Sequence, residues 1–477
     1  MNNKFETYQL EPVIIESLNV LGYIEPTAIQ QQVIPAALKG SDIVGQSQTG
    51  SGKTAAFAIP LCQNAVWEQN APQALVLEPT RELTVQVKEE IAQIGRTKRL
   101  KVPDVFGGFP IDKQIQTLKQ KSHIVVATPG RLMDHIRRGS IKLEGIRMVV
   151  IDEADLMLDM GFLPEVAEIL EHLQGRSQTM LFSATITTEI EALVRKYLVK
   201  PERISIEASA AQQANIVQKL YVTDKNEKYE VFHRLLMYEN PDSAMIFCGT
   251  KEMVNVLCRK LRKDGVKCGM IHGDIDQQDR IRTVNAFREG RFRYLIATDV
   301  VARGIDFEHL SHVFNYDFPT GRETYVHRIG RTGRNGDSGR AISLITEEDL
   351  RMKRMVELYL RTDLSCDELP ELTEERKAQF QKRQEEKPEL KKKKGADFKK
   401  TIMKLTISGG KKSKMRAVDI VGTICSIPGI SADDIGIIDV RDSLTYVEIL
   451  NKKGRLVLDA LQDKTIKGKI RKVRASR

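Results

Sequence analysis

A glycine-rich segment that directly follows a short apolar run constrains the fold of this chain most strongly. The run at 42–45 is followed by Ser47-Gln48-Thr49-Gly50-Ser51-Gly52-Lys53-Thr54. Glycines allow a tight turn whose backbone N–H groups surround a phosphate, and the N-terminus of a following helix adds positive potential. The segment therefore predicts a strand–turn–helix unit that binds a nucleotide, with Lys53 at the β- and γ-phosphates and the Thr54 hydroxyl at Mg²⁺. Ser47 stands where the strict motif has glycine, so a purely structural glycine turn is the alternative.

The same alternation of apolar runs and helix-period segments recurs through the first 350 residues. Such near-continuous apolar runs are typical of a parallel sheet covered by helices on both faces. They lie at 42–45, 74–77, 124–127, 148–151 and 179–182, and again at 244–248, 294–298, 312–315 and 341–345. The stretch between the two sets is small and polar, as in a linker. We therefore expect two tandem parallel α/β domains, at 1–207 and 215–362, joined by a linker at 208–214.

A charged segment and a smaller domain follow. Residues 363–402 are rich in charged side chains, so we expect an exposed, partly helical linker there. From 403 to 477 the order β-α-β-β-α-β suggests an α+β domain with the RNA-recognition-motif fold. We expect strands at 402–408, 435–440, 443–449 and 470–474, and helices at 414–425 and 454–462.

The positive charge of the chain is concentrated in this last domain. The whole chain carries a net charge of +10, and residues 403–477 hold 16 basic and 8 acidic side chains, whereas 1–364 hold 47 of each. A compact segment this basic is typical of proteins that bind nucleic acid, and a solvated basic surface without a partner is the alternative. After a Gly-Gly turn, the cations Lys411, Lys412, Lys414 and Arg416 suit a phosphate backbone. Tyr446 is the aromatic residue left on the third strand, so we do not expect several bases to stack on the sheet.

The composition excludes several classes of protein. Hydrophobic residues make up 41% of the chain and charged residues 29%, as in ordinary globular proteins. No run of about 18 apolar residues exists, and the first residues lack a signal-peptide core. The six cysteines are scattered and form no Cys-x-x-Cys pair. We therefore expect a cytoplasmic protein without a membrane span, a zinc site or a disulfide framework.

An acidic cluster, Asp152-Glu153-Ala154-Asp155, follows the apolar run at 148–151. An acid at the end of a neighbouring parallel strand lies where a second contact to Mg²⁺ is needed. We expect Asp152 to bind the metal, directly or through water, and Glu153 to position and deprotonate the attacking water. An exposed acidic turn is the alternative for the cluster in isolation. Its combination with the phosphate-binding segment favours a catalytic role.

The second domain has no phosphate-binding loop of its own but contains His327-Arg328-Ile329-Gly330-Arg331-Thr332-Gly333-Arg334. Two arginines three residues apart lie on one helical face and can reach the same phosphate. We expect Arg331 and Arg334 to be arginine fingers that neutralise charge on the γ-phosphate. A catalytic site divided in this way is complete only when both domains close around the nucleotide.

Together these motifs resemble those of the DEAD-box RNA helicases, over nearly all of residues 1–350. The resemblance implies two RecA-like domains that bind ATP and Mg²⁺. The segment 23–30, with Phe5 placed 17 residues before Gly22, is similar to the Q motif. By this resemblance Phe5 stacks on adenine, Gln30 hydrogen-bonds the N6/N7 edge of the base, and Asp306 contacts the ribose. A Gln amide offers one donor and one acceptor, which suits adenine.

Further segments match the family's RNA-contacting and coupling motifs. The RNA-contacting residues expected from this match are Pro79, Thr80, Arg81, Gly107, Gly108, Thr128, Pro129, Gly130, Arg131, Gly249, Thr250, Gln277, Arg280, Thr298, Arg303 and Gly304. Hydroxyls, arginines and helix N-termini suit phosphates and do not discriminate bases. The residues expected to couple hydrolysis to domain closure are Asp155, Ser183, Thr185 and His327. The segment 183–185 also fits a helix N-cap, and both roles are compatible.

The last domain contains Arg416-Ala417-Val418-Asp419 and Asp433-Asp434-Ile435-Gly436. With these segments it resembles the C-terminal domain of the bacterial DbpA-like helicases. This resemblance implies specific binding to a hairpin of 23S ribosomal RNA and a role in large-subunit assembly. The expected function is ATP-dependent local unwinding of short RNA duplexes by a monomer. Three alternatives are an ATP-gated clamp that remodels ribonucleoprotein without strand separation, a non-enzymatic RNA-binding protein and a processive DNA translocase.

Overall fold

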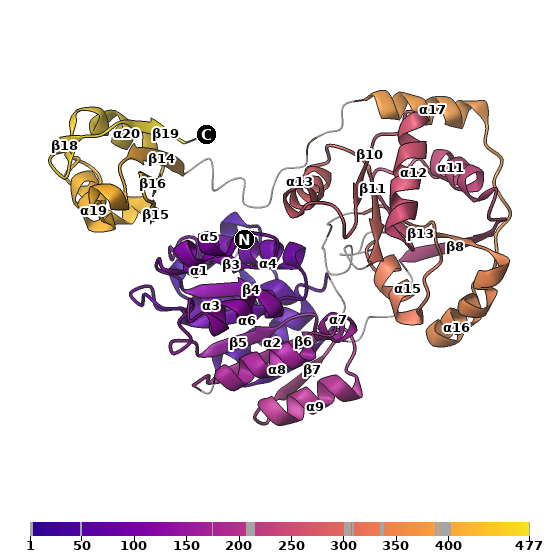
Figure 1. Ribbon diagram of the computed structural model, residues 1–477, viewed down its shortest axis with the longest axis horizontal. Helices are drawn as coiled ribbons and strands as arrows, with labels where there is room; N and C mark the ends of the chain where they lie inside the picture. Colours follow the sequence, from indigo (N-terminus) through magenta and orange to yellow (C-terminus); the bar gives the residue numbers. More distant parts are fainter. Residues whose placement is uncertain are drawn as a thin grey trace.

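The computed structural model describes residues 3–47, 50–173, 175–206, 215–299, 307, 310–333, 338–386, 390 and 402–476. Three units follow one another along the chain, each built on its own sheet (Figure 1). The first two are parallel α/β domains, and the third is a small α+β domain. The fold class predicted from the sequence is confirmed.

The first domain contains a seven-stranded parallel sheet with the order β3-β4-β2-β5-β6-β1-β7. Its strands are β1 (Ile43–Gln46), β2 (Ala74–Leu77), β3 (Asp104–Val105), β4 (Ile124–Ala127), β5 (Met148–Ile151), β6 (Gln178–Ser183) and β7 (Glu202–Ser205). Its helices are η1 (Lys4–Tyr8), α1 (Pro12–Val20), α2 (Ala28–Leu38), α3 (Lys53–Asn64), α4 (Arg81–Ile94), α5 (Ile111–Leu118), α6 (Pro129–Arg137), α7 (Ala154–Asp159), α8 (Leu163–His172) and α9 (Thr188–Tyr197).

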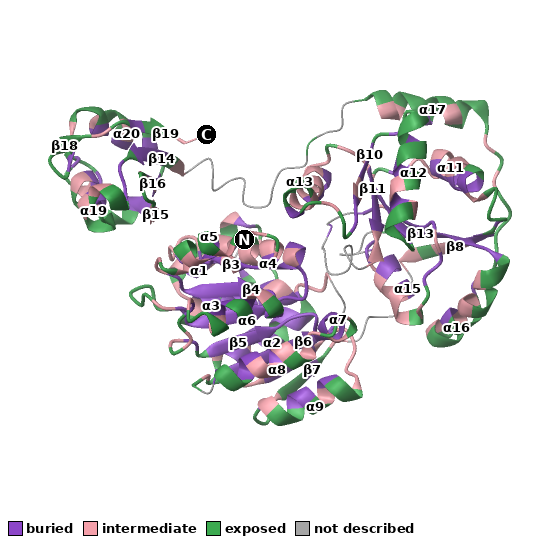
Figure 2. Cartoon of the chain, viewed as in Figure 1, coloured by how far each residue is buried: buried purple, intermediate pink, exposed green. Residues whose placement is uncertain are grey.

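Alternate residues of the central strands enter two separate cores. Ala74 and Val76 of β2 pack with apolar residues of α1 to α4, whereas Leu75 and Leu77 pack with those of α6 to α9. Because both faces are covered, the central strands are buried throughout (Figure 2). This burial explains why these strands are continuously apolar in the sequence.

The second domain repeats the plan with a six-stranded parallel sheet in the order β10-β11-β9-β12-β13-β8. Its strands are β8 (Ile216–Val222), β9 (Ala244–Cys248), β10 (Cys268–Ile271), β11 (Tyr294–Thr298), β12 (His312–Asn315) and β13 (Gly339–Ile345). Its helices are α11 (Lys228–Glu239), α12 (Lys251–Lys263), α13 (Gln277–Arg288), α15 (Arg322–Ile329), η2 (Glu347–Asp349) and α16 (Leu350–Leu360). A further helix, α17 (Glu374–Glu385), packs on α11 through the buried Phe380, so this part of the expected linker belongs to the packing of the second domain.

The third domain has a four-stranded antiparallel sheet in the order β15-β16-β14-β19. Its elements are β14 (Met403–Ser408), η3 (Lys411–Ser413), α19 (Ala417–Cys425), η4 (Ala432–Asp434), β15 (Ile435–Val440), β16 (Leu444–Ile449), α20 (Gly454–Asp463), β17 (Thr465–Ile466), β18 (Lys469–Ile470) and β19 (Val473–Ala475). The last strand predicted at 470–474 is divided. Residues 465–470 form a small hairpin, because Lys467 and Gly468 both have positive φ and reverse the chain. β19 follows this hairpin and pairs with β14 at the edge of the four-stranded sheet.

In the first two domains, the strands that the sequence did not reveal all lie at sheet edges. They are β3 and β7 in the first domain and β8 and β10 in the second. An edge strand has one neighbour and is partly exposed, so it does not need a continuous apolar run. In β7, for example, Ile204 is the single buried residue.

Side chains also connect the units. The Glu82 carboxylate of the first domain forms an ion pair with Arg280 of the second at 2.8 Å. Toward the third domain, the Arg96 guanidinium lies 2.9 Å from the Glu448 carboxylate, and the Lys101 ammonium donates to the Ile438 carbonyl at 2.6 Å. Among the helices that the structure describes, none is both long and apolar enough to cross a membrane.

Candidate functional site

The glycine-rich turn joins the end of β1 to the start of α3, as the sequence predicts. Gly50 and Gly52 have φ of 82° and 93°, a backbone conformation that favours glycine. A Cβ at Gly52 would lie 2.6 Å from the Gln30 amide nitrogen, so that position also requires the absence of a side chain. Lys53 then begins α3. The first N–H groups of a helix have no carbonyl partner within it, so they are suited to a phosphate in the turn. Gln48 and Thr49, also expected here, lie outside the described residues.

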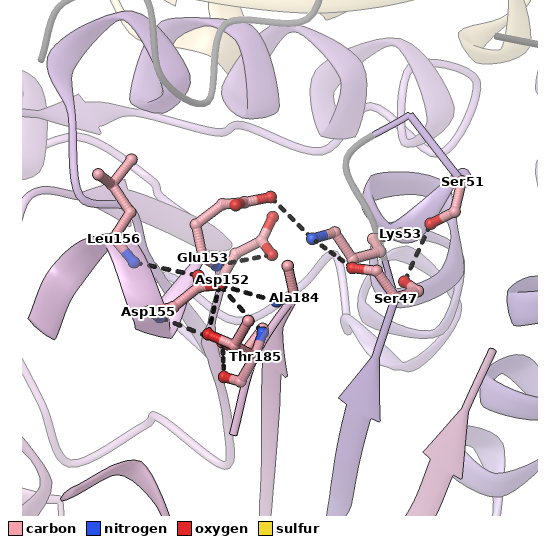
Figure 3. Close-up of polar contacts among 10 residues, drawn as sticks. Ser47, Ser51, Lys53, Asp152, Glu153, Asp155, Leu156, Ala184 and Thr185 are labelled. Atoms are coloured by element: carbon pink, nitrogen blue, oxygen red, sulfur yellow. Dashed lines mark hydrogen bonds and ion pairs between the residues drawn. The ribbon is translucent and has the colours of Figure 1, made fainter. Parts of the chain in front are cut away.

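Lys53 links this turn to the acidic cluster that follows β5. Its ammonium donates to the Glu153 carboxylate at 2.7 Å and to the Ser47 carbonyl at 3.3 Å (Figure 3). Lys53, Asp152 and Glu153 are only 5%, 3% and 8% exposed, so their charges interact in a poorly hydrated site. Burial alone would lower the pKa of Lys53, but the two carboxylates outweigh it and raise the pKa.

The two carboxylates differ in their electrostatic surroundings. Burial raises the pKa of Asp152 to about 7 against the opposing effect of Lys53. Burial also acts to raise the pKa of Glu153, but Lys53, and then Arg331 and His327, lower it below its ordinary value. Glu153 has a φ of 50°, a left-handed conformation that is uncommon outside glycine and often found at functional sites.

Asp155 connects the acidic cluster to the end of β6. One of its carboxylate oxygens accepts hydrogen bonds from the backbone N–H groups of Ala184 and Thr185, both at 3.1 Å, and from the Thr185 hydroxyl at 3.3 Å (Figure 3). The Ser183 hydroxyl accepts from the Asp155 N–H at 3.1 Å. The predicted coupling residues Asp155, Ser183 and Thr185 therefore form one hydrogen-bonded unit.

Gln30 and Phe5, the two residues expected to contact adenine, contact other residues of the protein in this structure. The Gln30 amide donates to the Gly52 carbonyl at 3.1 Å and accepts from the Thr27 N–H at 3.0 Å, so it holds the glycine-rich turn. Phe5 is fully buried, with edge-on contacts to the rings of Tyr8 and Tyr23. The stacking of Phe5 on adenine remains a prediction, and it requires the ring to leave this pocket. Asp306 lies outside the described residues.

The RNA-contacting residues expected in the first domain gather at the carboxyl ends of the neighbouring strands β2, β3 and β4. Thr80 and Thr128 are the N-caps of α4 and α6. Arg81 lies beside the Gly-Gly pair, where a Cβ at Gly108 would approach the guanidinium to 2.5 Å. The Arg131 guanidinium donates to the Phe109 carbonyl at 2.9 Å. Pro79, Thr80, Arg81, Gly107, Gly108, Thr128, Pro129, Gly130 and Arg131 are therefore brought together at one edge of the sheet.

In the second domain, the expected residues lie at the corresponding strand ends. Gly249 and Thr250 follow β9, where Thr250 is the N-cap of α12, and Thr298 ends β11. Gln277 at the start of α13 accepts from Arg81 at 3.1 Å and donates to Glu82 at 2.9 Å. The cluster of Arg81, Glu82 and Gln277 therefore joins the expected RNA-contacting motifs of the two domains.

His327 and Arg331 are the residues of the second domain that influence the pKa of Glu153. Arg331 follows α15 and is 3% exposed, and its Nε donates to the His327 carbonyl at 3.1 Å. Their electrostatic effect on Glu153 is consistent with the expected role of both residues at the nucleotide site, which stays a prediction. The expected residues Arg303, Gly304 and Arg334 lie outside the described residues.

The third domain presents its cations on exposed turns. Lys411, Lys412, Lys414 and Arg416 are all exposed. The first two lie in the 3-10 turn η3 and Lys414 is its C-cap, whereas Arg416 is the N-cap of α19, so the helix begins after these cations and not at 414 as expected. The Gly-Gly turn is needed for packing, since a Cβ at Gly410 would lie 1.9 Å from the Arg441 carbonyl. The ring of Tyr446 is flanked by Lys404 and Arg441, at 5.4 and 4.8 Å from its centre.

Sequence reasoning missed three buried charged residues near these motifs. Arg328 pairs with Asp299 through two short contacts of 2.5 and 2.6 Å. The Glu82 carboxylate forms an ion pair with Arg280 and accepts a hydrogen bond from Gln277. Glu78 follows β2 directly and is fully buried. The rule that identified Asp152, an acid just beyond an apolar strand, applies equally to Glu78 and could have found it.

Comparisons with known families agree with this geometry. Residues 27–193 match the family described as DEAD/DEAH box helicase, 227–336 match the helicase conserved C-terminal domain, and 404–475 match the DbpA RNA binding domain. The chain is 51% identical to the ATP-dependent RNA helicase DbpA of Bacillus subtilis over 98% of both chains. It is 40% identical to the DEAD-box ATP-dependent RNA helicase CshA of the same organism, over 80% of this chain and 77% of that protein.

Solved structures are similar as well. The structure of S. cerevisiae Dbp5 bound to RNA and ADP BeF3 has a TM-score of 0.70 and 31% identity, covering 76% of this chain and 95% of that one. The structure of Mss116p bound to ssRNA and AMP-PNP has a TM-score of 0.69 and 28% identity, covering 80% and 81%.

Proposed function

Because the chain belongs to the DEAD-box ATP-dependent RNA helicases, we propose that it locally unwinds short duplexes in 23S ribosomal RNA during assembly of the large ribosomal subunit. The observation that carries the targeting is the match of residues 404–475 to the DbpA RNA binding domain, next to the two helicase domains. The concentration of positive charge in the same residues supports this role. We further propose that the protein acts as a cytoplasmic monomer, because one chain supplies every motif of the site.

The nucleotide site is suited to ATP with Mg²⁺. The glycine-rich turn and the N-terminus of α3 offer backbone N–H groups to phosphates, and Thr54 and Asp152 are the proposed residues of the metal site. Bound Mg²⁺ supplies positive charge that stabilises the transferred phosphoryl group. The free-energy cost of burying the carboxylates in this site is offset when such a charge is present. The observed residues therefore fit the group that the family implies.

The ion pair between Lys53 and Glu153 supports a proposal for how the base is held before ATP binds. Lys53 holds Glu153 in the structure described here. A bound γ-phosphate is a stronger partner for an ammonium group than a single carboxylate, so Lys53 turns to the phosphate. Glu153 is then released to orient water and accept its proton. This exchange keeps the base occupied until the nucleotide arrives.

The second domain completes the site when the domains close. Arg331, with Arg334 as the second finger, neutralises charge on the γ-phosphate. Closure also brings the RNA-contacting motifs of both domains to one strand of RNA through the cluster of Arg81, Glu82, Gln277 and Arg280. A strand bent across both domains cannot remain in a regular A-form duplex, so a short helix opens locally. Release of phosphate removes the contacts that hold the domains together.

Strand displacement and ATPase assays with a panel of RNAs test this function. We expect ATP-dependent displacement of a short duplex next to a 23S rRNA hairpin, with much weaker stimulation by 16S rRNA of equal length. ATPase stimulation without displacement would favour the ATP-gated clamp. Equal stimulation by both RNAs would contradict the proposed targeting.

A further inference from the structure

Glu78 occupies a place in the nucleotide site to which neither the sequence motifs nor the mechanism gives a role. It is the first residue after β2, and β2 pairs in parallel with β5, Leu77 beside Ile151. The next residues along these strands are Glu78 and Asp152, and the Asp152 N–H donates to the Leu77 carbonyl at 3.1 Å. Glu78 and Asp152 are therefore neighbours at the same edge of the sheet.

The Glu78 side chain is buried, and its carboxyl group lacks a hydrogen-bond partner within the described part of the chain. Its exposed fraction is 0%, and neither carboxylate oxygen is hydrogen-bonded to any residue that the structure describes. The charged groups that act on it are Asp152, Glu153 and Lys53. Lys53, the cation among them, is engaged by Glu153. Burial and the two acids hold the pKa of Glu78 well above its ordinary value, and Lys53 opposes them.

A buried carboxyl group without a partner lowers the stability of a folded protein. Such a group is informative when it lies beside residues that bind a charged ligand, because the ligand can provide what the protein lacks. Magnesium keeps several water molecules when it binds to proteins and uses only one or two carboxylates directly. The remaining waters are hydrogen-bond donors, which an acceptor-only carboxylate can hold.

We propose that Glu78 is an additional acidic residue of the magnesium site, which accepts hydrogen bonds from metal-bound water beside Asp152 and strengthens Mg²⁺-dependent nucleotide binding. The inference rests on the proposed role of Asp152 in binding the metal. Glu78 then has a positioning role and takes no part in proton transfer. It also explains why a carboxyl group is present where an uncharged residue would pack at lower cost.

Binding of ADP measured by calorimetry, with the full-length protein in EDTA and in millimolar Mg²⁺, tests the proposal. We expect Glu78→Gln to reduce the gain in ADP affinity that Mg²⁺ provides by roughly tenfold, the lower end for residues that support a metal site from outside its ligand shell. Affinity in EDTA should be unchanged. The melting temperature of the nucleotide-free protein should rise, because a buried acid is replaced by a neutral amide of the same shape.

Two controls make the result decisive. Glu144→Gln makes the same chemical change at an exposed position and should alter neither quantity. Glu78→Thr should weaken Mg²⁺-dependent binding as Glu78→Gln does, which separates loss of the carboxylate from a packing defect. A higher melting temperature with an unchanged effect of Mg²⁺ would overturn the proposal, since Glu78 would then be a structural residue alone. Asp152→Asn tests the proposed metal ligand separately, and it should abolish most of the Mg²⁺ effect.

Discussion

The nucleotide site and the basic surface of the third domain use charge in opposite ways. Lys53, Asp152 and Glu153 are almost completely buried, and each is fixed by a strand end or a helix start. Lys411 and Lys412 are exposed on a turn. Chemistry on a phosphate requires charges held in one geometry with little water, whereas attachment to a long anion requires accessible cations. From this difference we predict that the proposed hydrolysis and targeting functions reside in separable parts of the chain.

The largest effect is expected at Glu153, the buried residue that we propose as the catalytic base. Glu153→Gln keeps the size of the side chain but removes its ability to accept a proton, so kcat for ATP should fall by roughly 10²–10⁴-fold. RNA and ATP binding should persist, because Lys53 still faces the phosphates. Steady-state ATPase assays and filter binding measure the two quantities. A near-normal kcat would mean that another group acts as the base.

Reversal of charge on the exposed turn should have the next largest effect, and on a different quantity. Lys411→Glu combined with Lys412→Glu should weaken binding to a 23S rRNA hairpin on the order of 100-fold at low salt and reduce the salt slope by about two. Basal ATPase should be unchanged. Charge reversal at the distant, exposed Lys142 provides the control. Affinity that survives in the double variant would place the RNA-binding surface elsewhere.

Gln30 should show a smaller effect within the nucleotide site. Gln30→Ala removes the amide that holds the Gly52 carbonyl and the proposed contact with adenine, so the KM for ATP should rise about tenfold, within the range for a bidentate base contact. The preference for ATP over GTP should narrow. Competition assays with both nucleotides check this. A raised KM with an unchanged ATP/GTP ratio would show that Gln30 supports the turn and does not select the base.

The smallest effect concerns the stability of the third domain. The Asp434 carboxylate accepts from the Lys453 ammonium at 2.9 Å, the Asn451 amide at 3.0 Å and the Ser431 N–H at 2.8 Å, and these contacts lower its pKa. Asp434→Asn should lower the free energy of unfolding by about 1.5–3 kcal/mol, the range for hydrogen bonds to a charged group.

The contribution of Asp434 to stability should depend on pH with a defined sign. Because the folded pKa of Asp434 is depressed, its contribution is complete above the unfolded value of about 4 and is lost as the pH falls below it. Thermal unfolding of the wild type between pH 7 and pH 3 should therefore show a loss of stability that Asp434→Asn shows more weakly. Identical profiles for the two proteins would contradict the assignment.

The central strands and the order of the motifs were predictable because burial on both faces leaves a strong apolar signal. The runs at 74–77, 124–127 and 148–151 agree with β2, β4 and β5 to the residue. Edge strands such as β7 lack this signal. In the third domain, the division of the last strand depends on positive φ at Lys467. A lysine in the sequence does not predict this backbone conformation, which is uncommon outside glycine.

The residues of the site were less predictable than the strands. A motif places Lys53, Asp152 and Glu153 at one edge of the sheet, but it does not reveal that Lys53 pairs with Glu153. Nor does the motif reveal that Phe5, whose stacking on adenine stays a prediction, makes edge-on contacts with two tyrosines. These features depend on contacts between segments far apart in the chain, which a pattern within one segment does not record.

The most direct test of the division of labour compares RNA-stimulated ATPase of the full chain and of residues 1–402, with 23S and 16S rRNA fragments of equal length. The account predicts that the full chain prefers the 23S fragment strongly. The shortened chain should be stimulated equally by both, and only at high RNA concentration. If the shortened chain still prefers the 23S fragment, selectivity lies in the two helicase domains and the account is contradicted.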